Sequence, residues 1–237
     1  MENLVGYIGA ALTKSTLMME REQFYNRRDA GIKLGRILER QFKDTNPLVL
    51  GIPRGGVEVA YEVALILRGK LSVLITKKLP HPLQPELAIG AAAEDGSVFL
   101  GSLAHGWEPD TIRDIVNRQL NEIQSRIQRF RKGKPLPEMR GRTVILVDDG
   151  IATGSTLVPA IKLCKSKKAA QLIVAAPVSG RNYISEINSL ADQVVIAIQP
   201  PDLSSVGEVY RDFKNLSDTD VVRILDDYAK NHHRVLS

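Results

Sequence analysis

Apolar residues fall into short runs that alternate with longer stretches of helical periodicity. The short runs predict buried strands at residues 48–52, 71–76, 143–147, 172–176 and 194–198. The longer stretches predict helices at residues 21–41, 57–67, 111–130, 155–164 and 218–230. Strand–helix–strand units form parallel strands that are joined by right-handed crossovers. The pattern therefore predicts one α/β domain with a mostly parallel central sheet flanked by helices.

A hairpin is predicted in the middle of the chain. Residues 89–93 and 97–100 are short β-prone runs on either side of Glu94, Asp95 and Gly96. Asp-Gly between two such runs is a turn signal, because glycine readily adopts the backbone angles that tight hairpins need. The sequence thus adds a pair of antiparallel strands to the parallel ones.

The predicted helix at residues 111–130 has one apolar face and one face rich in arginine. Arginine on a helix face is typical of nucleic-acid binding and also of an ordinary solvated surface. Asp114 and Glu122 interrupt the basic face, which favours the solvated surface.

Composition narrows the class of protein only a little. The 237-residue chain has 43% hydrophobic and 25% charged residues, the balance of an ordinary globular protein. Its single cysteine, Cys164, rules out an intrachain disulfide and fits a reducing compartment. The net charge of +5 favours anionic partners such as nucleic acid or polyphosphate metabolites, or it reflects a basic solvated surface.

Nothing in the sequence predicts a membrane span. No apolar run reaches the ~20 residues that a membrane helix needs. Residues 1–19 are mildly apolar, but Glu2 stands where a signal peptide is positively charged, and Lys14 interrupts the run. We therefore expect a cytoplasmic protein with an N-terminal extension at residues 1–21 and one domain at residues 22–237.

The most informative segment is TVILVDDGIATGST, at residues 143–156. An apolar strand leads directly into Asp148 and Asp149, and a loop of small and hydroxyl-bearing residues then leads into a helix. Ligands of open parallel sheets bind beyond the carboxyl ends of the strands, so both acids should face a site. The loop and the helix N-terminus suit a phosphate, whereas two acids suit sugar hydroxyls or a metal ion. Helix capping alone would need one acid and not an adjacent pair.

A second predicted strand end carries GIPRGG, at residues 51–56. Gly55 and Gly56 permit unusual backbone angles, so we expect successive N–H groups to converge on an anion. Arg54 adds a planar cation with several hydrogen-bond donors.

Lys77 and Lys78 follow the predicted strand at residues 71–76. The three prolines within residues 80–85 preclude a helix after them. The two lysines are either a solvated basic turn or a further contact for an anion.

The segment at residues 143–156 resembles the 5-phosphoribosyl 1-pyrophosphate (PRPP) binding motif of type I phosphoribosyltransferases, which has four apolar residues, two acids and a Thr-Gly-containing loop. The resemblance implies the type I fold, with a small hood built from the terminal segments and including residues 200–217. It implies that Asp148 and Asp149 hold the ribose 2′- and 3′-hydroxyls. The loop residues that would hold the 5-phosphate are Ala152, Thr153, Gly154, Ser155 and Thr156. Gly150 departs from the motif, which usually has an apolar residue there, and this should widen the loop's freedom.

The same resemblance assigns the GIPRGG loop to pyrophosphate. The implied pyrophosphate contacts are Arg54, Gly55, Gly56, Lys77 and Lys78. The implied catalytic residues are Asp148, Asp149 and Arg54. The implied reaction is displacement at ribose C1 by a nitrogen acceptor, a nucleobase or a related compound, with release of pyrophosphate. Mg²⁺ is the implied cofactor and contacts the acid pair only indirectly, and a homodimer is the expected assembly.

The likeness extends over residues 22–222. The segments FYNRRDAG, KKLPHPLQPELAIGA and SSVGEVYRDF are similar to a subgroup of stand-alone phosphoribosyltransferase-domain proteins of bacteria and archaea, some of them fused to hydrolases. That subgroup usually has an aromatic residue at the position where this chain has Leu203. The absence of the aromatic ring argues against base stacking from this position. We expect Tyr210 and Phe213 to lie in the core. Ala152 stands where 6-oxopurine enzymes have an acid, which disfavours hypoxanthine and guanine as acceptors.

An alternative function is a PRPP-sensing regulator, which would keep the fold and bind DNA or RNA. The basic helix at residues 111–130 would be its binding surface. No recognisable DNA-binding module precedes the core, so the enzyme is the favoured interpretation, and nucleic acid is not an expected partner.

Overall fold

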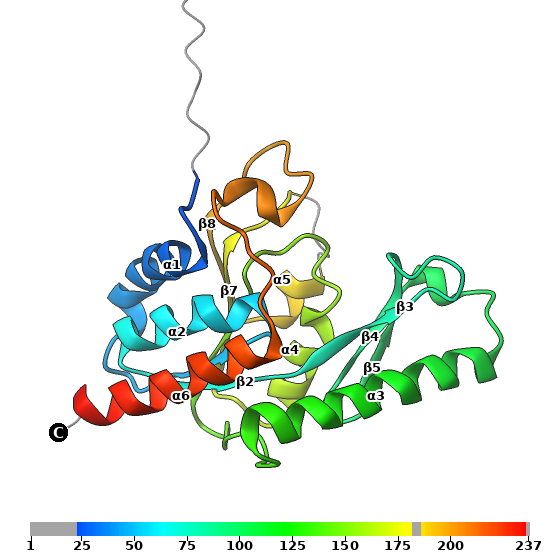
Figure 1. Ribbon diagram of the computed structural model, residues 1–237, viewed down its shortest axis with the longest axis horizontal. Coiled ribbons are helices and arrows are strands. Elements are labelled where there is room, and N and C mark those ends of the chain that lie inside the picture. The colour runs from blue at the N-terminus through cyan, green and yellow to red at the C-terminus, as the bar shows by residue number, and fades with distance from the viewer. Residues whose placement is uncertain (1–22, 182–185, 236–237) are drawn as a thin grey trace, which may run out of the picture.

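A computed structural model describes residues 23–181 and 186–235 of the chain. Its centre is a five-stranded parallel sheet in the order β2-β1-β6-β7-β8 (Figure 1). The strands are β1 (Leu48–Gly51), β2 (Lys70–Val73), β6 (Thr143–Val147), β7 (Gln171–Val178) and β8 (Gln193–Ile198). The predicted α/β class with a parallel central sheet is therefore confirmed.

Helices cover both faces of this sheet. They are α1 (Arg27–Phe42) and α2 (Gly55–Leu67) on one face, and α4 (Leu157–Ser166) and α5 (Glu186–Leu190) on the other. Neighbouring side chains of a strand point to opposite faces. Leu48 and Leu50 of β1 accordingly pack in the α4–α5 core, whereas Val49 packs against α1 and α2. Because both faces are covered, the strands read as continuous apolar runs in the sequence.

Four of the five predicted helix starts differ from the structure. α2 and α3 each begin two residues earlier than predicted. α1 begins at Arg27, after an N-cap in which the Asn26 side chain accepts a hydrogen bond from Asp29 N at 2.9 Å. Residues 23–26 are not helical, and residues 21–22 of the predicted helix, like the N-terminal extension, lie outside the described residues. α4 begins at residue 157, so all of the predicted phosphate-loop residues precede the helix.

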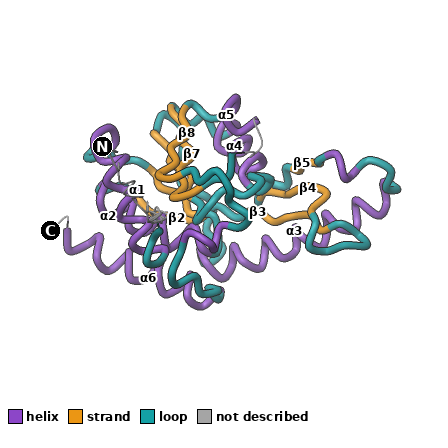
Figure 2. Tube along the Cα trace, turned by 90° about the horizontal axis from the view of Figure 1, so that it is seen from above, coloured by secondary structure: helices purple, strands orange, loops and turns teal. Residues whose placement is uncertain are grey.

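A second sheet of three antiparallel strands extends from the side of the first (Figures 1 and 2). Its elements are β3 (Thr76–Pro80), β4 (Ala88–Ala93), β5 (Val98–Leu100), the short helix η1 (Ser102–Ala104) and the long helix α3 (Pro109–Arg131), which packs along the sheet. β4 and β5 confirm the predicted hairpin, and Gly96 in its turn has a φ of 86°.

The single strand predicted at residues 71–76 is wrong. β2 ends at Val73 and β3 begins at Thr76, in the other sheet. Leu74 and Ile75 between them are both fully buried, Leu74 with the central sheet and Ile75 with α3. An apolar run therefore continues across a change of sheet, which periodicity alone does not reveal.

The predicted hood is formed by two segments that are distant in the sequence. Phe24 forms a β-bridge with Tyr210, and Phe24 N donates to Val209 O at 2.7 Å. The hood also contains the short helix η2 (Val206–Val209), and α6 (Asp218–Val235) follows it. Tyr210 is buried and Phe213 is half-buried, in agreement with the expected core positions.

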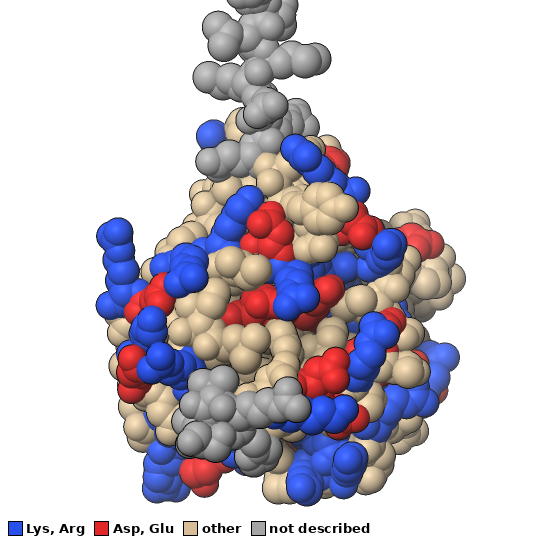
Figure 3. Space-filling model, turned by 60° about the vertical axis from the view of Figure 1, so that its left-hand side comes forward, with Lys and Arg blue, Asp and Glu red and all other residues tan. Residues whose placement is uncertain are grey.

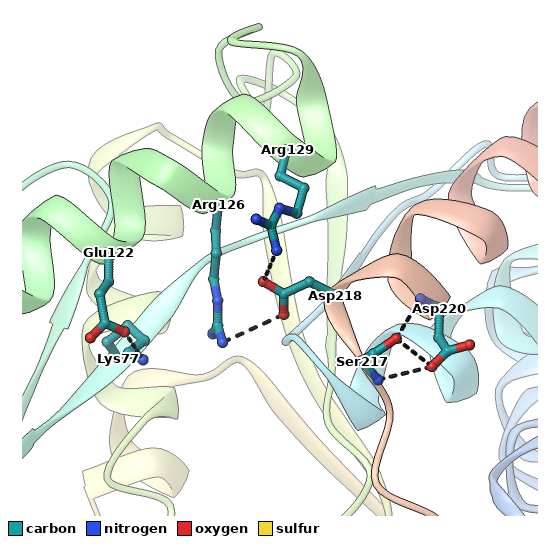
Figure 4. A network of polar contacts seen from close by, with 7 residues as sticks. All are labelled: Lys77, Glu122, Arg126, Arg129, Ser217, Asp218 and Asp220. Carbon is teal, nitrogen blue, oxygen red and sulfur yellow. Dashed lines mark hydrogen bonds and ion pairs between the residues drawn. The ribbon is translucent and has the colours of Figure 1, made fainter.

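The arginines of α3 are mostly paired with acids. Asp218, at the start of α6, lies 3.1 Å from Arg129 and 3.6 Å from Arg126 (Figure 4). Arg131 and Glu94 form a buried ion pair at 2.9 Å. These arginines fasten α3 to α6 and to the end of β4, so they do not form a free basic surface.

Charges of both signs are interspersed on the side of the molecule that carries α1, α2 and α6 (Figure 3). The described part of the chain contains no helix that is long and apolar enough to cross a membrane.

Candidate active site

Two neighbouring strands, β1 and β6, end side by side and define the site. They are parallel, with Gly51 opposite Val147, and Ile52 N donates to Val147 O at 2.8 Å. From β1 the chain continues through α2 to β2 on one side, whereas from β6 it continues to β7 and β8 on the other. A crevice at such a switch point is where open α/β sheets bind ligands. The acid pair and the GIPRGG loop both begin there.

The GIPRGG loop lies directly against the acid pair. A Cβ atom on Gly55 would lie 1.8 Å from Asp149 Oδ2, and one on Gly56 would lie 2.9 Å from Asp148 Cα. Both glycines belong to the first turn of α2, and neither has a positive φ. The expectation of unusual backbone angles at these two positions is therefore wrong. Glycine is required because the acid pair leaves no room for a side chain.

The acid pair is held by hydrogen bonds from three directions. Asp149 N donates to Asp148 Oδ1 at 2.9 Å. Arg27 Nε donates to Asp149 Oδ2 at 2.7 Å, and the Tyr210 hydroxyl donates to Asp149 O at 2.6 Å. The position of Asp149 thus depends on α1 and on the hood, two elements that are far from it in the sequence.

The local environment shifts the pKa values of two side chains in the site, Asp148 and Tyr210. Burial raises the pKa of Asp148 well above its ordinary value, and the negative charge of Asp149 raises it further. The positive charge of Lys78 lowers the same pKa. Burial also raises the pKa of the Tyr210 hydroxyl, which therefore remains a donor at neutral pH.

The loop that follows the acid pair is anchored at its start. Ile151 N donates to Val178 O at 2.8 Å, and Gly180 N donates to Ile151 O at 3.1 Å. Thr153 Oγ1 lies 3.3 Å from Ser155 Oγ, and both side chains belong to the part of the loop that precedes α4. The loop is thus fixed to β7 while its hydroxyls gather at the start of the helix.

The end of the loop turns sharply before α4. Gly154 has a left-handed backbone with a φ of 78°, and a Cβ there would lie 2.4 Å from Ile187 Cδ1. Ala152 and Thr153 are exposed. Thr156 precedes α4 and makes no side-chain capping hydrogen bond. The N-terminus of α4 therefore points its partial positive charge at the loop without a capping side chain.

Gly150 is a site of close packing. A Cβ on Gly150 would lie 2.3 Å from Val206 Cγ1 and 2.9 Å from Val178 Cγ1. The glycine lets the hood approach β7 and the acid pair, so its role is steric and the expected gain in loop freedom is not its explanation.

The three predicted cations lie in different environments. Arg54 is exposed at the start of α2, and the peptide bond between Pro53 and Arg54 is cis. Lys77 forms an ion pair with Glu122 of α3 (Figure 4). Lys78 is its neighbour on β3, points to the other face of the strand, is exposed, and acts on the pKa of Asp148.

Sequence reasoning missed two residues of the site. Arg27 lies in the FYNRRDAG segment and Tyr210 in the SSVGEVYRDF segment, but no role was assigned to either in the site. Their positions beside Asp149 arise from tertiary contacts with the hood. The sequence did contain a usable signal, an arginine on an otherwise apolar helix face. The structure buries that arginine, and Arg27 is 6% exposed.

The site does not contain a ready-made metal centre. Among residues 23–181 and 186–235, no three His, Cys, Asp or Glu side chains are grouped so that they could hold a metal ion. One of the two acids is also paired with Arg27. Mg²⁺ is commonly held by one or two carboxylates together with substrate phosphates. The residues therefore fit a Mg²⁺ ion that is bound mainly by a phosphorylated substrate.

A parallel sheet with an acid pair and a small-residue loop at its switch point is the architecture of the type I phosphoribosyltransferase fold. The sequence pattern described as the phosphoribosyl transferase domain matches residues 20–205. The chain belongs to this family.

Two proteins of Mycobacterium tuberculosis, from strains CDC 1551 and H37Rv, are each 41% identical to the chain over 206 residues. Both carry the name "Putative phosphoribosyl transferase". The match covers 86% of this chain and 46% of each relative, so the chain spans about half the length of the curated relatives it matches.

A solved structure is similar over most of its length. The crystal structure of TT1426 from Thermus thermophilus has a TM-score of 0.73 and 35% sequence identity with the chain. The similarity covers 87% of this chain and 99% of that one. The same fold thus occurs there in a chain of similar extent.

Proposed function

We propose that the protein is a PRPP-dependent phosphoribosyltransferase, which transfers the 5-phosphoribosyl group to a nitrogen acceptor and releases pyrophosphate. The observation that carries the proposal is the contact between the GIPRGG segment and the acid pair, in which Gly55 lies against Asp149. The loop after the acid pair is suited to a 5-phosphate, and the GIPRGG segment is suited to pyrophosphate. A single ligand with a phosphate at each end and a ribose between them would contact both loops and the acid pair together.

The acid pair is assigned to the ribose. Asp148 Oδ1 and Asp149 Oδ2 already accept hydrogen bonds from protein groups. The other oxygen of each carboxylate is the acceptor for a ribose hydroxyl. Hydroxyl groups are donors and suit the carboxylate oxygens, which are acceptors.

The 5-phosphate is assigned to residues 152–156. This loop offers the backbone N–H groups of the exposed residues Ala152 and Thr153, the hydroxyls of Thr153 and Ser155, and the N-terminus of α4. The left-handed backbone at Gly154 turns the chain around the space in which the phosphate would lie.

Pyrophosphate is assigned to Arg54, Gly55, Gly56 and one lysine. We choose Lys78, because Lys77 is paired with Glu122 whereas Lys78 is exposed and acts on Asp148. As the acceptor nitrogen bonds to ribose C1, the C1–O bond to pyrophosphate breaks and negative charge develops on the leaving oxygen. Arg54 and Lys78 stabilise that charge. Asp148 and Asp149 orient the ribose, and their charge balances the positive charge that develops at C1.

Mg²⁺ bound to PRPP would supply further positive charge to the leaving group. Asp148 and Asp149 are the residues of this chain that would face the ion, at most through water or through the ribose hydroxyls. The hood at residues 200–217 would cover the acceptor.

The proposal is tested by measuring pyrophosphate release from PRPP and Mg²⁺ with a panel of nucleobases and amines. Hypoxanthine and guanine should be poor acceptors, because Ala152 stands where 6-oxopurine enzymes have an acid. PRPP with Mg²⁺ should also raise the melting temperature, because a ligand at 100 times its Kd adds about 2.7 kcal/mol to the free energy of unfolding. Millimolar PRPP that leaves the melting temperature unchanged would contradict the assignment of the site.

The alternative of a PRPP-sensing nucleic-acid binder receives less support. It relied on a basic face of α3, and the arginines at 126, 129 and 131 are paired with acids. Salt-dependent binding of DNA or RNA would reverse this preference.

A further inference from the structure

We propose that Arg27 is a positioning residue that links the hood to the acid pair. It holds Asp149 in the orientation that receives the ribose, and the hood in turn holds Arg27. The inference rests on the proposed function and extends it to a residue that does not contact the substrate. Arg27 would make ribose binding depend on the position of the hood.

The first part of the link is the contact with Asp149. Arg27 Nε donates to Asp149 Oδ2 at 2.7 Å, and the Arg27 side chain is only 7% exposed. The same guanidinium lies beside the pyrophosphate loop, because a Cβ on Gly55 would lie 2.6 Å from Arg27 Nε. A charge-assisted hydrogen bond in a buried site is short and strong. The bond to Oδ2 therefore restrains the Asp149 carboxylate, and with it the position of Oδ1.

The second part of the link is the contact with the hood. Arg27 Nη1 donates to Lys214 O at 2.7 Å, and its guanidinium carbon lies 3.9 Å from the centre of the Phe213 ring. Phe213 in turn stacks on Tyr210, with 4.9 Å between the ring centres, and the Tyr210 hydroxyl donates to Asp149 O. These contacts run from the Asp149 side chain through Arg27, Phe213 and Tyr210 back to the Asp149 backbone. A shift of the hood therefore alters both the side chain and the backbone of Asp149.

Arginine is the side chain that can make these three contacts at once. It is planar, carries several donors in fixed directions and stacks on an aromatic ring. Lysine has one nitrogen and would keep the charge while losing either the carbonyl bond or the stacking contact. The proposal therefore predicts that lysine at position 27 does not replace arginine.

The neighbouring residue provides a matched control. Arg28 lies on the same turn of α1, and its Nε donates to Glu62 Oε1 of α2 at 2.6 Å. Its side chain is 66% exposed, and its partner is not part of the acid pair. Arg28→Gln removes one arginine and one ion pair from the same helix without touching the proposed link.

The experiment compares the Kd values of two probes, ribose 5-phosphate and inorganic phosphate, in the wild type and in Arg27→Gln, Arg27→Lys and Arg28→Gln. Both Arg27 variants should bind ribose 5-phosphate about tenfold more weakly, the effect of one lost charge-assisted contact. Their affinity for inorganic phosphate should be unchanged, because the 5-phosphate loop is separate. Arg28→Gln should leave both Kd values unchanged. Equally weakened binding of both probes in the Arg27 variants would overturn the proposal. A wild-type Kd for ribose 5-phosphate in Arg27→Lys would also overturn it.

Phe213→Leu tests the hood side of the link. It should weaken ribose 5-phosphate binding by about threefold through Arg27, and it should have no further effect in an Arg27→Gln background. An additive effect in the double variant would show that Phe213 acts by another route and would overturn the link.

A ligand-free measurement keeps this inference separate from the proposed function. Arg27→Gln should accelerate amide hydrogen exchange in residues 210–214 relative to wild type and to Arg28→Gln. Unchanged exchange there would overturn the inference, even in a protein that uses PRPP. A wild type that binds ribose 5-phosphate but releases no pyrophosphate with any acceptor would instead contradict the proposed function alone.

Discussion

Gly55 and Asp149 are separated along the chain by almost a hundred residues, yet a Cβ on Gly55 would lie 1.8 Å from Asp149 Oδ2. One residue begins α2 and the other follows β6. Because β1 and β6 are neighbours in the sheet, the loops that leave them share one space. The two halves of the site are thus in direct contact.

Gly55→Ala should therefore damage the site more than an ordinary helix substitution would. The methyl group must displace the Asp149 carboxylate and the Arg27 guanidinium, and overpacking of this kind costs about 1–3 kcal/mol. We expect a lower melting temperature and a large loss of PRPP affinity. Gly101→Ala is the control, because the nearest atom to its Cβ would be Ile89 O at 3.8 Å. An active, stable Gly55→Ala protein would mean that Asp149 is free to move.

Removing the charge of Asp148 and removing the charge of Asp149 should change the stability of the protein in opposite directions. The pKa of Asp148 is raised above its ordinary value of 3.8 in the folded protein, so the folded state retains a proton that the unfolded chain has lost. Stability is then lost as the pH rises from that ordinary value through the raised pKa. Asp148→Asn removes this loss, so the variant should melt higher than wild type at neutral pH and depend less on pH.

Asp149→Asn should instead destabilise the protein, because it leaves the buried Arg27 without an anionic partner. The expected cost is about 1.5–3 kcal/mol, that of a hydrogen bond to a charged group. Both single variants should lose turnover. Thermal melts of the two proteins between pH 5 and 8 distinguish the cases, and a parallel fall in stability would contradict the asymmetry.

Arg54→Ala should affect the leaving-group side of the site. Arg54 is exposed at the start of α2 and follows a different strand from the 5-phosphate loop. Losing one charge-assisted donor should weaken pyrophosphate binding by about 1.5–3 kcal/mol and leave ribose 5-phosphate binding nearly unchanged. Titration of both ligands into wild type and variant measures the difference. Equal losses would indicate that Arg54 only maintains the shape of the loop.

Lys77 and Lys78 should differ although they are adjacent. Lys78→Ala should weaken pyrophosphate binding, because Lys78 is exposed and its positive charge reaches Asp148. Lys77→Ala should leave pyrophosphate binding unchanged and reduce stability by less than about 1 kcal/mol, since its ion pair with Glu122 is partly exposed. The pyrophosphate Kd of each variant checks the assignment, and the reverse order would transfer the role to Lys77.

Local patterns in the sequence determined the class of the fold and the position of the site. Continuous apolar runs define strands that are buried on both faces, and such runs separated by helices form a parallel sheet. Because ligands bind at the carboxyl ends of these strands, the residues just after β1 and β6 could be assigned to a site from the sequence alone. The acid pair, Arg54 and residues 152–156 were predicted as site residues in this way, since each lies in the segment that leaves a strand end.

Only the tertiary structure decided which residues complete the site. Arg27 comes 122 positions before Asp149, and Tyr210 comes 61 positions after it, and no local pattern encodes either distance. The run at residues 71–76 is predominantly apolar because both sheets bury its apolar side chains, so its division between β2 and β3 depends on which core each of these side chains enters. On β3, Lys77 pairs with Glu122 of α3, whereas the positive charge of Lys78 lowers the pKa of Asp148. Burial and hydrogen bonding between distant segments are properties of the packed molecule, whereas hydrophobic periodicity is a property of the chain.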